Sequence, residues 1–529
     1  MAKTVYLTTP LYYVNAPPHI GHSYTNIAAD AMARYQRLKG REVFLLTGTD
    51  EHGQKIAQAA QAAGKTPHAF VDGVVEQFTG LWKTLAISYD DFIRTTQVRH
   101  VQAVQAILSQ LHDRKQLVHA TYDGWYCTPC ETFWTTEEMG ARAGTTAACG
   151  TCGRDVEPVS ESGWYLPLRA AQGWLVAFVK SHPTFVRPES RYNELVSLLE
   201  QPLPEYLCIT RPKQRVSWGI PVPFSQEHVT YVWFDALLNY ITVAGYPANL
   251  SRFSTLWPAD VQFIGKDILR HHAVYWPIML HALGCSDDQM PRTIVAHGWW
   301  TVGEQKMSKS LGNIVDPSIV IGHLLTDQPY AADVYRYFLL REVPFGQDGS
   351  FSEEAILTRL EADLANDLGN LVNRTLSMIE RYCDGKIPPV GAVGCAGDDE
   401  PLQHAALALS EEVDQAMDRI EFSSALEAIM RVVSMANRYI ELAAPWTLAR
   451  QQKRARLSAV LRLLAEVIRI VAIVLEPFMP SVACAAWRQL GCDNAPRRFD
   501  DMANWPRLPD GQPIGPHPVL FPRGKVVGP

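Results

Sequence analysis

Two short segments of the sequence carry side chains suited to holding phosphate groups. The first contains His19, Gly21 and His22, between an apolar run at 5–8 and a stretch with helical spacing that stops at Gly40. Histidines at a strand–turn–helix junction can donate hydrogen bonds to phosphate oxygens, and the helix N-terminus adds free N–H groups and a partial positive charge. Gly21 would leave room for a nucleotide against the backbone. The segment therefore predicts a nucleotide-phosphate site.

The second segment is a loop that contains Lys306, Ser308, Lys309, Ser310 and a following glycine. Two ammonium groups and two hydroxyls on a flexible loop can close over a triphosphate and neutralise the charge that grows as pyrophosphate leaves. By itself such a string is more often a solvated surface loop. Paired with the histidine turn and placed after a predicted strand, it indicates phosphate chemistry.

Four cysteines are paired by their spacing. Cys127 and Cys130 form one CxxC, Cys149 and Cys152 form another, and eighteen residues separate the two pairs. This separation fits tetrahedral thiolate ligation of Zn²⁺, and the alternative is four unligated thiols. Four thiolates would close the coordination shell, so we expect one structural zinc per chain and not a catalytic metal.

The first 115 residues alternate between predicted strands and helices. Strands are expected at 42–47 and 91–94, and helices from 55 onward and over 101–111. Strands separated by amphipathic helices predict a parallel, doubly wound sheet of the Rossmann-like kind. Asp50 follows one of these strands, and ligands bind beyond the carboxyl ends of such strands. We therefore expect Asp50 and the histidine turn to face one crevice.

The alternation breaks over 116–225, which contains the cysteines, and then resumes. Strands are expected at 231–235, 261–264 and 293–296, with a helix that carries His271 and His272. The cysteine segment is therefore predicted to be inserted between two halves of one sheet domain. Beyond residue 350 strands vanish, and four amphipathic helices are expected over roughly 353–383, 401–419, 422–443 and 452–476. They predict a C-terminal all-helical bundle.

Composition limits the alternatives. The chain has 529 residues, 47% hydrophobic residues and a net charge of −7, which is typical of a soluble globular protein and not of a general nucleic-acid binder. The most apolar run, 467–475, contains Arg469, so no membrane span is expected. The chain enters its first strand without a signal-peptide pattern, which predicts a cytoplasmic location.

The histidine turn and the lysine loop together resemble the double signature of the class I aminoacyl-tRNA synthetases. More narrowly, the chain is similar to the methionyl-tRNA synthetases. The similar stretches are the two cysteine pairs together with 9–13, 19–22, 47–55, 218–223, 231–240, 263–276, 306–313, 366–374 and 436–446. The signature pair alone would define only the class, and the added stretches favour methionine.

The resemblance implies a division of the chain and a reaction. The expected parts are a catalytic domain in two halves (1–115 and 226–320), a connective insertion with the zinc knuckle (116–225), a linker or stem-contact region (321–355) and a helical anticodon-binding domain (356–529). The family makes methionyl adenylate and pyrophosphate from methionine and ATP with Mg²⁺, and then transfers the methionyl group to the terminal adenosine of tRNA(Met). A monomer is expected by the same resemblance.

The resemblance also implies roles for single residues. His19, His22, Lys306 and Lys309 would be catalytic, and the ATP contacts would be His19, Gly21, His22, Gly265, Asp267 and Lys309. Asp50 would hold the substrate ammonium group. The remaining methionine contacts would be Leu11, Tyr13, Trp233, Ala236, Leu237, Tyr240, Ile268 and His272. Aromatic rings suit a thioether, and Tyr13 or His272 would offer one polar partner.

Each of these residues also has an ordinary structural interpretation. The methionine contacts are equally typical of a sheet core. Leu237 stands where one branch of the family has proline, which affects only the pocket's shape. The implied anticodon contacts are Asn370, Arg374 and Trp446, since tryptophan stacks on an unpaired base and Asn and Arg read base edges. Without the resemblance they would be taken as a solvated face and a helix-end packing residue.

Three other functions fit parts of the sequence. In another class I enzyme, such as a cysteinyl-tRNA synthetase, the zinc lies at the amino-acid site, and four cysteines in an inserted segment argue against that. A small-molecule nucleotidyltransferase needs neither the insertion nor the helical bundle. A non-catalytic, synthetase-derived tRNA-binding protein is disfavoured because His19, His22, Asp50, Lys306 and Lys309 are intact.

Overall fold

The computed structural model describes residues 3–139, 147–150, 152–303, 305–306, 314–390, 399–493 and 497–522, with backbone alone at 137, 138, 305 and 306. The chain forms two compact units. The first comprises Met1–Pro18, Val43–Gly80 and Tyr89–Gly298, and the second comprises His19–Glu42, Leu81–Ser88 and Trp299–Pro529. Each unit is described separately.

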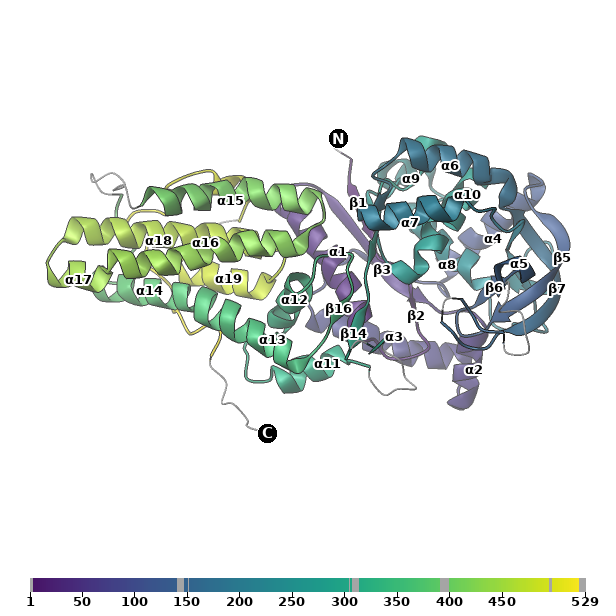
Figure 1. Ribbon diagram of the computed structural model, residues 1–529, viewed down its shortest axis with the longest axis horizontal. Coiled ribbons are helices and arrows are strands. Elements are labelled where there is room, and N and C mark those ends of the chain that lie inside the picture. The colour runs from purple at the N-terminus through teal and green to yellow at the C-terminus, as the bar shows by residue number, and fades with distance from the viewer. Residues whose placement is uncertain are drawn as a thin grey trace. The chain divides into compact units, whose positions relative to one another are not determined.

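A seven-stranded parallel sheet forms the centre of the first unit (Figure 1). Its order is β2-β3-β1-β12-β13-β8, and β4 pairs with β3. The strands are β1 (Val5–Thr8), β2 (Tyr12–Tyr13), β3 (Val43–Asp50), β4 (Asp91–Arg94), β8 (Val186–Arg187), β12 (Val261–Gly265) and β13 (Ile294–His297). Five of these strands were predicted from the sequence, and the parallel α/β class is confirmed.

The sheet brings the carboxyl ends of several strands to one edge. In the parallel pairing of β2 with β3, Tyr13 is the register partner of Asp50. Gly265 ends β12 and is the register partner of His297, which ends β13. Since ligands of such sheets bind beyond the carboxyl ends of the strands, the edge that carries these residues is the expected place for a site.

Helices connect the strands of the first unit and build its inserted segment. They are α2 (Gln54–Ala62), α4 (Val98–Asp113), α5 (Thr136–Met139), α6 (Gln172–Ser181), α7 (Glu189–Leu199), α8 (Val232–Ala244), α9 (Leu250–Leu256) and α10 (Trp276–Ala282). A 3-10 turn at Lys266–Ile268 and a π-helical turn at His271–Tyr275 lead into α10. Helix α3 (Pro67–Thr84) begins in this unit and ends within the second.

The strand expected at 231–235 is wrong, because these residues begin helix α8. Tyr231 is the extended N-cap residue, and the helix continues until Gly245 adopts a left-handed conformation with φ 114°. The error has a physical cause. A buried helix that is apolar around its circumference shows no clear period, and its first aromatic and β-branched residues favour a strand in a short window.

The cysteine segment forms a second, antiparallel sheet. Its order is β6-β5-β7-β9, built from β5 (Val118–Cys127), β6 (Thr132–Trp134), β7 (Glu157–Pro167) and β9 (Tyr206–Cys208). A two-stranded sheet of β10 (Thr210–Pro212) and β11 (His228–Thr230) follows. Strand β8, which lies within the segment expected to be an insertion, pairs with β13 of the main sheet and was not predicted.

Helices make up most of the second unit. They are α1 (Ile20–Leu38), α11 (Pro317–Ile319), α12 (Ala331–Arg341), α13 (Glu353–Arg359), α14 (Asn370–Tyr382), α15 (Glu400–Asp418), α16 (Phe422–Ala443), α17 (Pro445–Arg450), α18 (Arg454–Leu475) and α19 (Pro480–Gln489). The four long predicted helices are confirmed, and α14, α15, α16 and α18 run side by side (Figure 1). Within the described ranges, no helix is long and apolar enough to cross a membrane.

Two further features complete the second unit. A small sheet joins β14 (Trp300–Val302), β15 (Gln305–Lys306) and β16 (Gly349–Ser350). Arg336 of α12 is fully buried, forms an ion pair with Asp30 of α1 at 2.7 Å, and donates to the carbonyl oxygens of Leu85, Pro477 and Phe478. Because a buried guanidinium needs this many acceptors, Arg336 fixes α1 against α12, the residue after α3 and the connection between α18 and α19.

Candidate functional site

The histidine turn caps helix α1 with its own imidazoles. Nδ1 of His19 accepts a hydrogen bond from the Gly21 N–H at 3.1 Å, and Nδ1 of His22 accepts from the His19 N–H at 3.1 Å. The rings stack with centroids 3.8 Å apart. Because a backbone N–H can only donate, Nδ1 of each ring is unprotonated and Nε2 carries the ring proton. Both rings are therefore neutral donors, and their Nε2–H groups can bind phosphate oxygens.

Two further observations support this arrangement. Burial, and then the nearby His19, holds the pKa of His22 well below its ordinary value, so its ring stays neutral at physiological pH. A Cβ at Gly21 would meet ring atoms of His19 at 3.0–3.1 Å. The His19 imidazole thus lies directly beside the Gly21 backbone, and the predicted contact of Gly21 with a nucleotide stays a prediction.

Asp50 ends strand β3 with a buried and incompletely bonded carboxylate. It is 7% exposed, and its Oδ1 has no hydrogen-bond partner among the described residues. Burial, and next the negative charge of Asp235, raises the pKa of Asp50 well above its ordinary value, although the His52 N–H hydrogen bonds to it. A buried carboxylate oxygen without a partner is a strong acceptor for a ligand cation, and a cation would restore its ionised form.

Most of the residues predicted to line the apolar methionine pocket lie on one face of helix α8 and in the turns after β12. Trp233, Ala236, Leu237 and Tyr240 are spaced i, i+3, i+4 and i+7, which places them on one side of the helix. Ala236, Leu237, Tyr240 and His272 are buried, whereas Leu11, Tyr13, Trp233 and Ile268 are half-buried. Leu11 and Ile268 pack on the cluster that contains Leu237 and Tyr240, and Tyr13 and Trp233 share a neighbouring cluster.

The polar groups of this pocket are held in place. Nδ1 of His272 lies 3.0 Å from the Ile268 carbonyl oxygen, so it carries the proton and donates. Burial lowers the pKa of His272 to about 4, and the neutral ring accepts at Nε2 from the Tyr240 hydroxyl at 2.8 Å. The His272 ring therefore has no spare donor for a thioether, although the sequence predicted that Tyr13 or His272 would offer one polar partner.

The hydroxyl of Tyr13 is engaged as well. It donates to Oε1 of Glu131 at 3.2 Å. Burial, followed by the charges of Glu131 and Asp50, raises the pKa of Tyr13 well above its usual value, so the hydroxyl stays protonated. The pocket thus offers aromatic and aliphatic surface with its own polar atoms satisfied, and one unsatisfied anion nearby on β3.

A buried cluster of charge lies behind Asp50. Asp235 of α8 accepts from Nδ1 of His52 at 2.6 Å and from Nε2 of His100 at 2.7 Å. Burial opposes its ionisation, but the two imidazoles hold the pKa of Asp235 below its ordinary value. The backbone N–H of His52 also hydrogen bonds to Asp50. By holding the His52 side chain, Asp235 therefore fixes a backbone group that contacts the Asp50 carboxylate.

The residues implied as ribose contacts follow strand β12. The Oδ1 atom of Asp267 lies 2.6 Å from the position that a Cβ at Gly265 would take. Gly265 is therefore needed for the close approach of this carboxylate to the strand end. Lys306 pairs through its backbone with Thr301, whereas its side chain and the whole of Lys309 lie outside the described residues.

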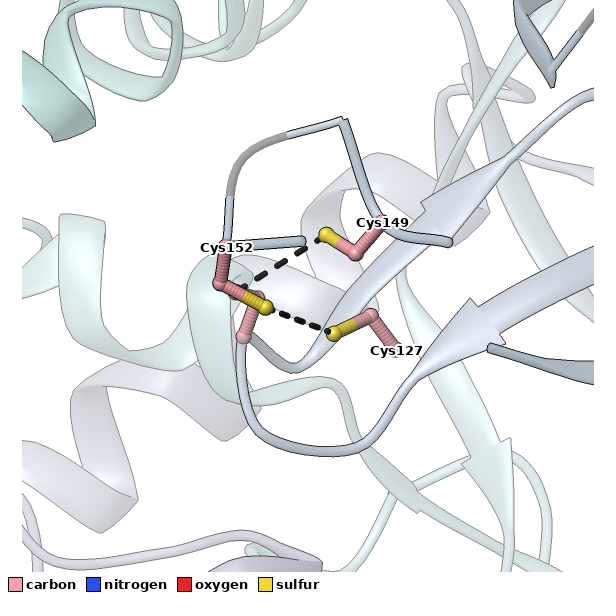
Figure 2. A group of neighbouring side chains, drawn as sticks. Cys127, Cys149 and Cys152 are labelled. Atoms are coloured by element: carbon pink, nitrogen blue, oxygen red, sulfur yellow. Dashed lines mark hydrogen bonds between the residues drawn. The ribbon is translucent and has the colours of Figure 1, made fainter. Parts of the chain in front are cut away.

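The structure brings all four paired cysteines together. Their Sγ atoms lie within 4.8 Å of one another, with Cys127 and Cys152 3.6 Å apart and Cys130 and Cys149 4.0 Å apart. Figure 2 shows the sulfur atoms of Cys127, Cys149 and Cys152 turned toward one another from two loops. Tetrahedral zinc with Zn–S bonds of about 2.3 Å requires S–S separations of about 3.8 Å. The cluster is thus consistent with one zinc ion.

The surroundings disfavour the thiolate form of Cys127 and Cys130. Hydrogen bonding with Cys127 and Cys149, and then burial, raise the pKa of the Cys130 thiol. A divalent cation at the centre of the cluster would supply the positive charge that deprotonates the thiols, so the donor set fits a metal better than a set of free cysteines.

A separate polar cluster lies on the helical bundle of the second unit. Arg374 of α14 forms an ion pair with Glu441 of α16 at 2.7 Å, and its guanidinium carbon lies 5.7 Å from the centroid of the Trp446 ring. Asn370, one turn earlier, donates to Asn437 of α16 at 3.4 Å. The predicted trio therefore lies along one α14–α16–α17 surface.

Sequence reasoning missed several partners of these residues. They are Glu131, His52, His100 and Asp235 around the pocket, and Asn437 and Glu441 on the bundle. Glu131 has no signal in the sequence beyond its place after Cys130, because only the fold brings it to Tyr13. By contrast, Asn437 and Glu441 are four residues apart on a predicted helix, so their shared face was available from spacing alone.

A parallel sheet, a histidine turn that opens a helix, and a following helical bundle together define a class I aminoacyl-tRNA synthetase. Residues 5–376 match the family described as tRNA synthetases class I (M), and residues 387–525 match the anticodon binding domain of methionyl tRNA ligase.

Whole-chain relatives agree with these matches. A methionine–tRNA ligase of Caldanaerobacter subterraneus is 46% identical over 99% of this chain and 79% of its own length, and that of Halalkalibacterium halodurans is 44% identical over 98% and 78%. The Mycobacterium tuberculosis methionyl-tRNA synthetase in complex with methionyl-adenylate superimposes with a TM-score of 0.92 at 40% identity, covering 98% of this chain and 100% of that one. The chain belongs to the methionyl-tRNA synthetase family, and its activity is that of a methionine–tRNA ligase.

Proposed function

We propose that this enzyme binds methionine between β2, β3 and α8 and converts it with ATP to methionyl adenylate. The observation that carries the proposal is the unpartnered Oδ1 of the buried Asp50. The substrate ammonium group would bind there and restore the charge that burial suppresses. Because the ammonium is then fixed, the adjacent carboxylate is aimed at the α-phosphorus of ATP, and much of the rate comes from positioning.

The phosphates of ATP would be bound by the histidine turn. The Nε2–H groups of His19 and His22 are the donors, and their neutral state avoids a fixed charge that would hold pyrophosphate after the reaction. Lys306 and Lys309 would neutralise the charge that develops on the leaving pyrophosphate. Gly265 and Asp267 would contact the ribose, with the Asp267 carboxylate as acceptor. We expect Mg²⁺ to accompany ATP, as is usual for phosphoryl substrates.

The selectivity for methionine would come from the shape of the pocket and from its polarizable aromatic surface. Leu11, Leu237 and Ile268 supply aliphatic surface, and the rings of Tyr13, Trp233 and Tyr240 supply contacts that suit sulfur. Ala236 leaves room at the centre of the α8 face. Since His272 and Tyr13 are already bonded within the protein, a side chain that needs its own hydrogen bonds would pay a desolvation penalty there.

The second half-reaction requires recognition of tRNA(Met). We infer that Trp446 stacks on an unpaired anticodon base and that Arg374 and Asn370 read base edges. The guanidinium of Arg374 is already held between Glu441 and the Trp446 ring, so little ordering would be needed when RNA binds.

The remaining expectations belong to the same proposal. Cys127, Cys130, Cys149 and Cys152 would hold one structural zinc. The division of the chain into five parts remains a prediction. So do the monomeric state of the enzyme and its cytoplasmic location, where tRNA(Met) would be its partner.

An exchange assay tests the proposed activation. Purified enzyme should incorporate labelled pyrophosphate into ATP in the presence of methionine and without tRNA. Leucine, isoleucine, valine and cysteine should give at most about 1% of that rate. The reason is that one methylene or one heteroatom in a shaped pocket changes the binding free energy by roughly 1–3 kcal/mol, and two such differences combine. An enzyme that responds to another amino acid and not to methionine would refute the proposal.

A further inference from the structure

The loop that carries the first two cysteines reaches, through the residue after Cys130, the proposed methionine pocket. Glu131 directly follows Cys130 and adopts a left-handed backbone conformation with φ 49°. This turn carries its side chain away from the cysteine cluster and into the unit, where it is only 4% exposed. Burying a carboxylate costs free energy unless its oxygens are hydrogen bonded, so the partners of Glu131 must compensate for its burial.

Both carboxylate oxygens of Glu131 are used. Oε1 accepts from the Tyr13 hydroxyl at 3.2 Å and from the backbone N–H of Lys55 at 2.9 Å. Oε2 accepts from the Tyr126 hydroxyl. One carboxylate therefore joins β2, the start of α2 and β5. Of these three contacts, the one to Tyr13 is made to a side chain of the proposed pocket.

The same loop supports a second wall of the pocket. The carbonyl oxygen of Cys130 accepts from the indole Nε1–H of Trp233 at 3.4 Å, and the carbonyl oxygen of Glu131 accepts from the hydroxyl of Tyr231, the N-cap residue of α8. Tyr13 and Trp233 share one apolar cluster, and Tyr13 is thus hydrogen bonded to Glu131 while Trp233 is hydrogen bonded to the preceding residue, Cys130.

The approach of the loop is close enough to exclude any side chain at Gly53. A Cβ there would lie 2.7 Å from the Tyr13 hydroxyl and 3.0 Å from Oε1 of Glu131, and Gly53 also has φ 108°, which favours glycine. Glycine at position 53, in the β3–α2 connection, is therefore required for the hydrogen bond between Tyr13 and Glu131.

We propose that Glu131 is a positioning residue for methionine, which fixes the Tyr13 ring through its hydroxyl while the adjoining carbonyls fix Trp233 and the start of α8. The inference rests on the proposed function, since it takes Tyr13 and Trp233 as pocket walls. It assigns the cysteine loop a role in amino-acid binding in addition to its own folding. Glu131 itself contacts no reacting atom.

Kinetics of pyrophosphate exchange test the role. Glu131→Ala removes both acceptors and should raise the KM for methionine at least about tenfold, as expected for loss of a hydrogen bond to a charged group, with the KM for ATP and kcat within about threefold. Glu131→Gln should restore most of the affinity, because its amide oxygen can accept from Tyr13 and Lys55 while its NH₂ donates to the Tyr126 oxygen. Zinc content, measured by mass spectrometry, should stay the same in all variants.

Two further variants separate positioning from folding. Glu157→Ala removes an exposed carboxylate that contacts Thr128 of the same loop at 3.2 Å but touches no pocket residue, and it should leave the methionine KM unchanged. Tyr13→Phe removes only the hydroxyl, should raise the methionine KM, and should add little to Glu131→Ala in the double variant.

The possible failures are distinguishable. A wild-type enzyme without a methionine response would refute the proposed function. A wild-type response that Glu131→Ala leaves within twofold would overturn the role of Glu131. If Glu131→Ala does not fold, Tyr13→Phe decides, because an unchanged methionine KM in that variant would also overturn it.

Discussion

Asp50 is a residue whose proposed binding role opposes the stability of the fold. Its carboxylate is buried beside other acidic groups, and burial raises its pKa above the ordinary value of 3.8. As pH rises from that value, the unfolded chain releases its proton before the folded chain does, so the folded state loses stability until the pH passes the raised pKa. At neutral pH the site therefore favours a state with a bound cation.

Replacing Asp50 should separate function from stability. Asp50→Asn should lower kcat/KM for methionine in pyrophosphate exchange by at least about 100-fold, or roughly 2.7 kcal/mol, because the ammonium loses its anion. The same change should raise the midpoint of thermal unfolding at pH 7.5, since it removes a buried carboxylate whose Oδ1 has no hydrogen-bond partner among the described residues. A lower midpoint, or exchange close to the wild-type rate, would contradict the assigned role.

His272 makes the opposite contribution to the pH dependence of stability. Burial lowers its pKa from 6.5 to about 4. As pH falls through 6.5, His272 is protonated in the unfolded chain but stays neutral in the folded chain. The folded state therefore loses, between pH 6.5 and about 4, up to about 3 kcal/mol of the free energy of unfolding that it has above pH 6.5. Thermal unfolding between pH 7 and 5 should show this loss, and His272→Gln should have a shallower slope. An unchanged slope would mean that His272 titrates normally.

At the scale of elements, the cysteine cluster is the feature whose removal is most informative. Metal analysis should give about one zinc per chain. Treatment with a chelator selective for transition metals, in excess Mg²⁺, should release it and raise the methionine KM about tenfold or more, because the loop that carries Cys130 and Glu131 loses its anchor. Added Zn²⁺ should reverse the change. A metal-free enzyme with unchanged methionine KM would contradict the account.

The sequence predicted the elements of strong and simple period. The parallel strands at β1, β3, β4, β12 and β13 and the four long helices of the bundle followed from apolar patterns and from turn residues such as Gly40, which has φ 76°. The N-cap and first residues of helix α8, at 231–235, were predicted to be a strand. The helix is apolar around its circumference, so its sequence shows no helical period of apolar and polar residues. The two-residue strand β8 is too short to produce any pattern, and only its pairing with β13 defines it.

The candidate site was predictable where its residues belong to recognisable segments. The strand and turn pattern supplied the histidine turn and the position of Asp50, and the spacing alone supplied the four cysteines, whereas the resemblance supplied the α8 face and the role of each residue. Hydrogen-bond partners from distant segments were not predictable. Glu131 reaches Tyr13 across 118 positions and Asp235 reaches His52 across 183, and no local pattern encodes such contacts.

At the scale of the whole molecule, two kinds of chemistry lie in different parts of the chain. The proposed methionine pocket, with Asp50, α8 and the cysteine cluster, belongs to the first unit. The histidine turn and the Arg374–Trp446 surface belong to the second. The family matches divide the chain differently, since the match over 5–376 contains the histidine turn and Arg374, whereas the match over 387–525 contains Trp446. Activation and tRNA recognition should still respond to different substitutions, because the proposed contacts to methionine and ATP and the proposed contacts to tRNA are different residues.

The most direct test of the whole account compares the two half-reactions in Trp446→Ala. Tryptophan stacking on a base contributes roughly 1–3 kcal/mol, so aminoacylation of tRNA(Met) at subsaturating tRNA should fall about tenfold to a hundredfold. Methionine-dependent pyrophosphate exchange without tRNA should stay within about twofold of wild type, and Trp446→Phe should retain part of the aminoacylation. Equal loss of both activities would show that Trp446 only supports the fold, and no loss of either would contradict the assignment of the α14–α16–α17 surface to tRNA.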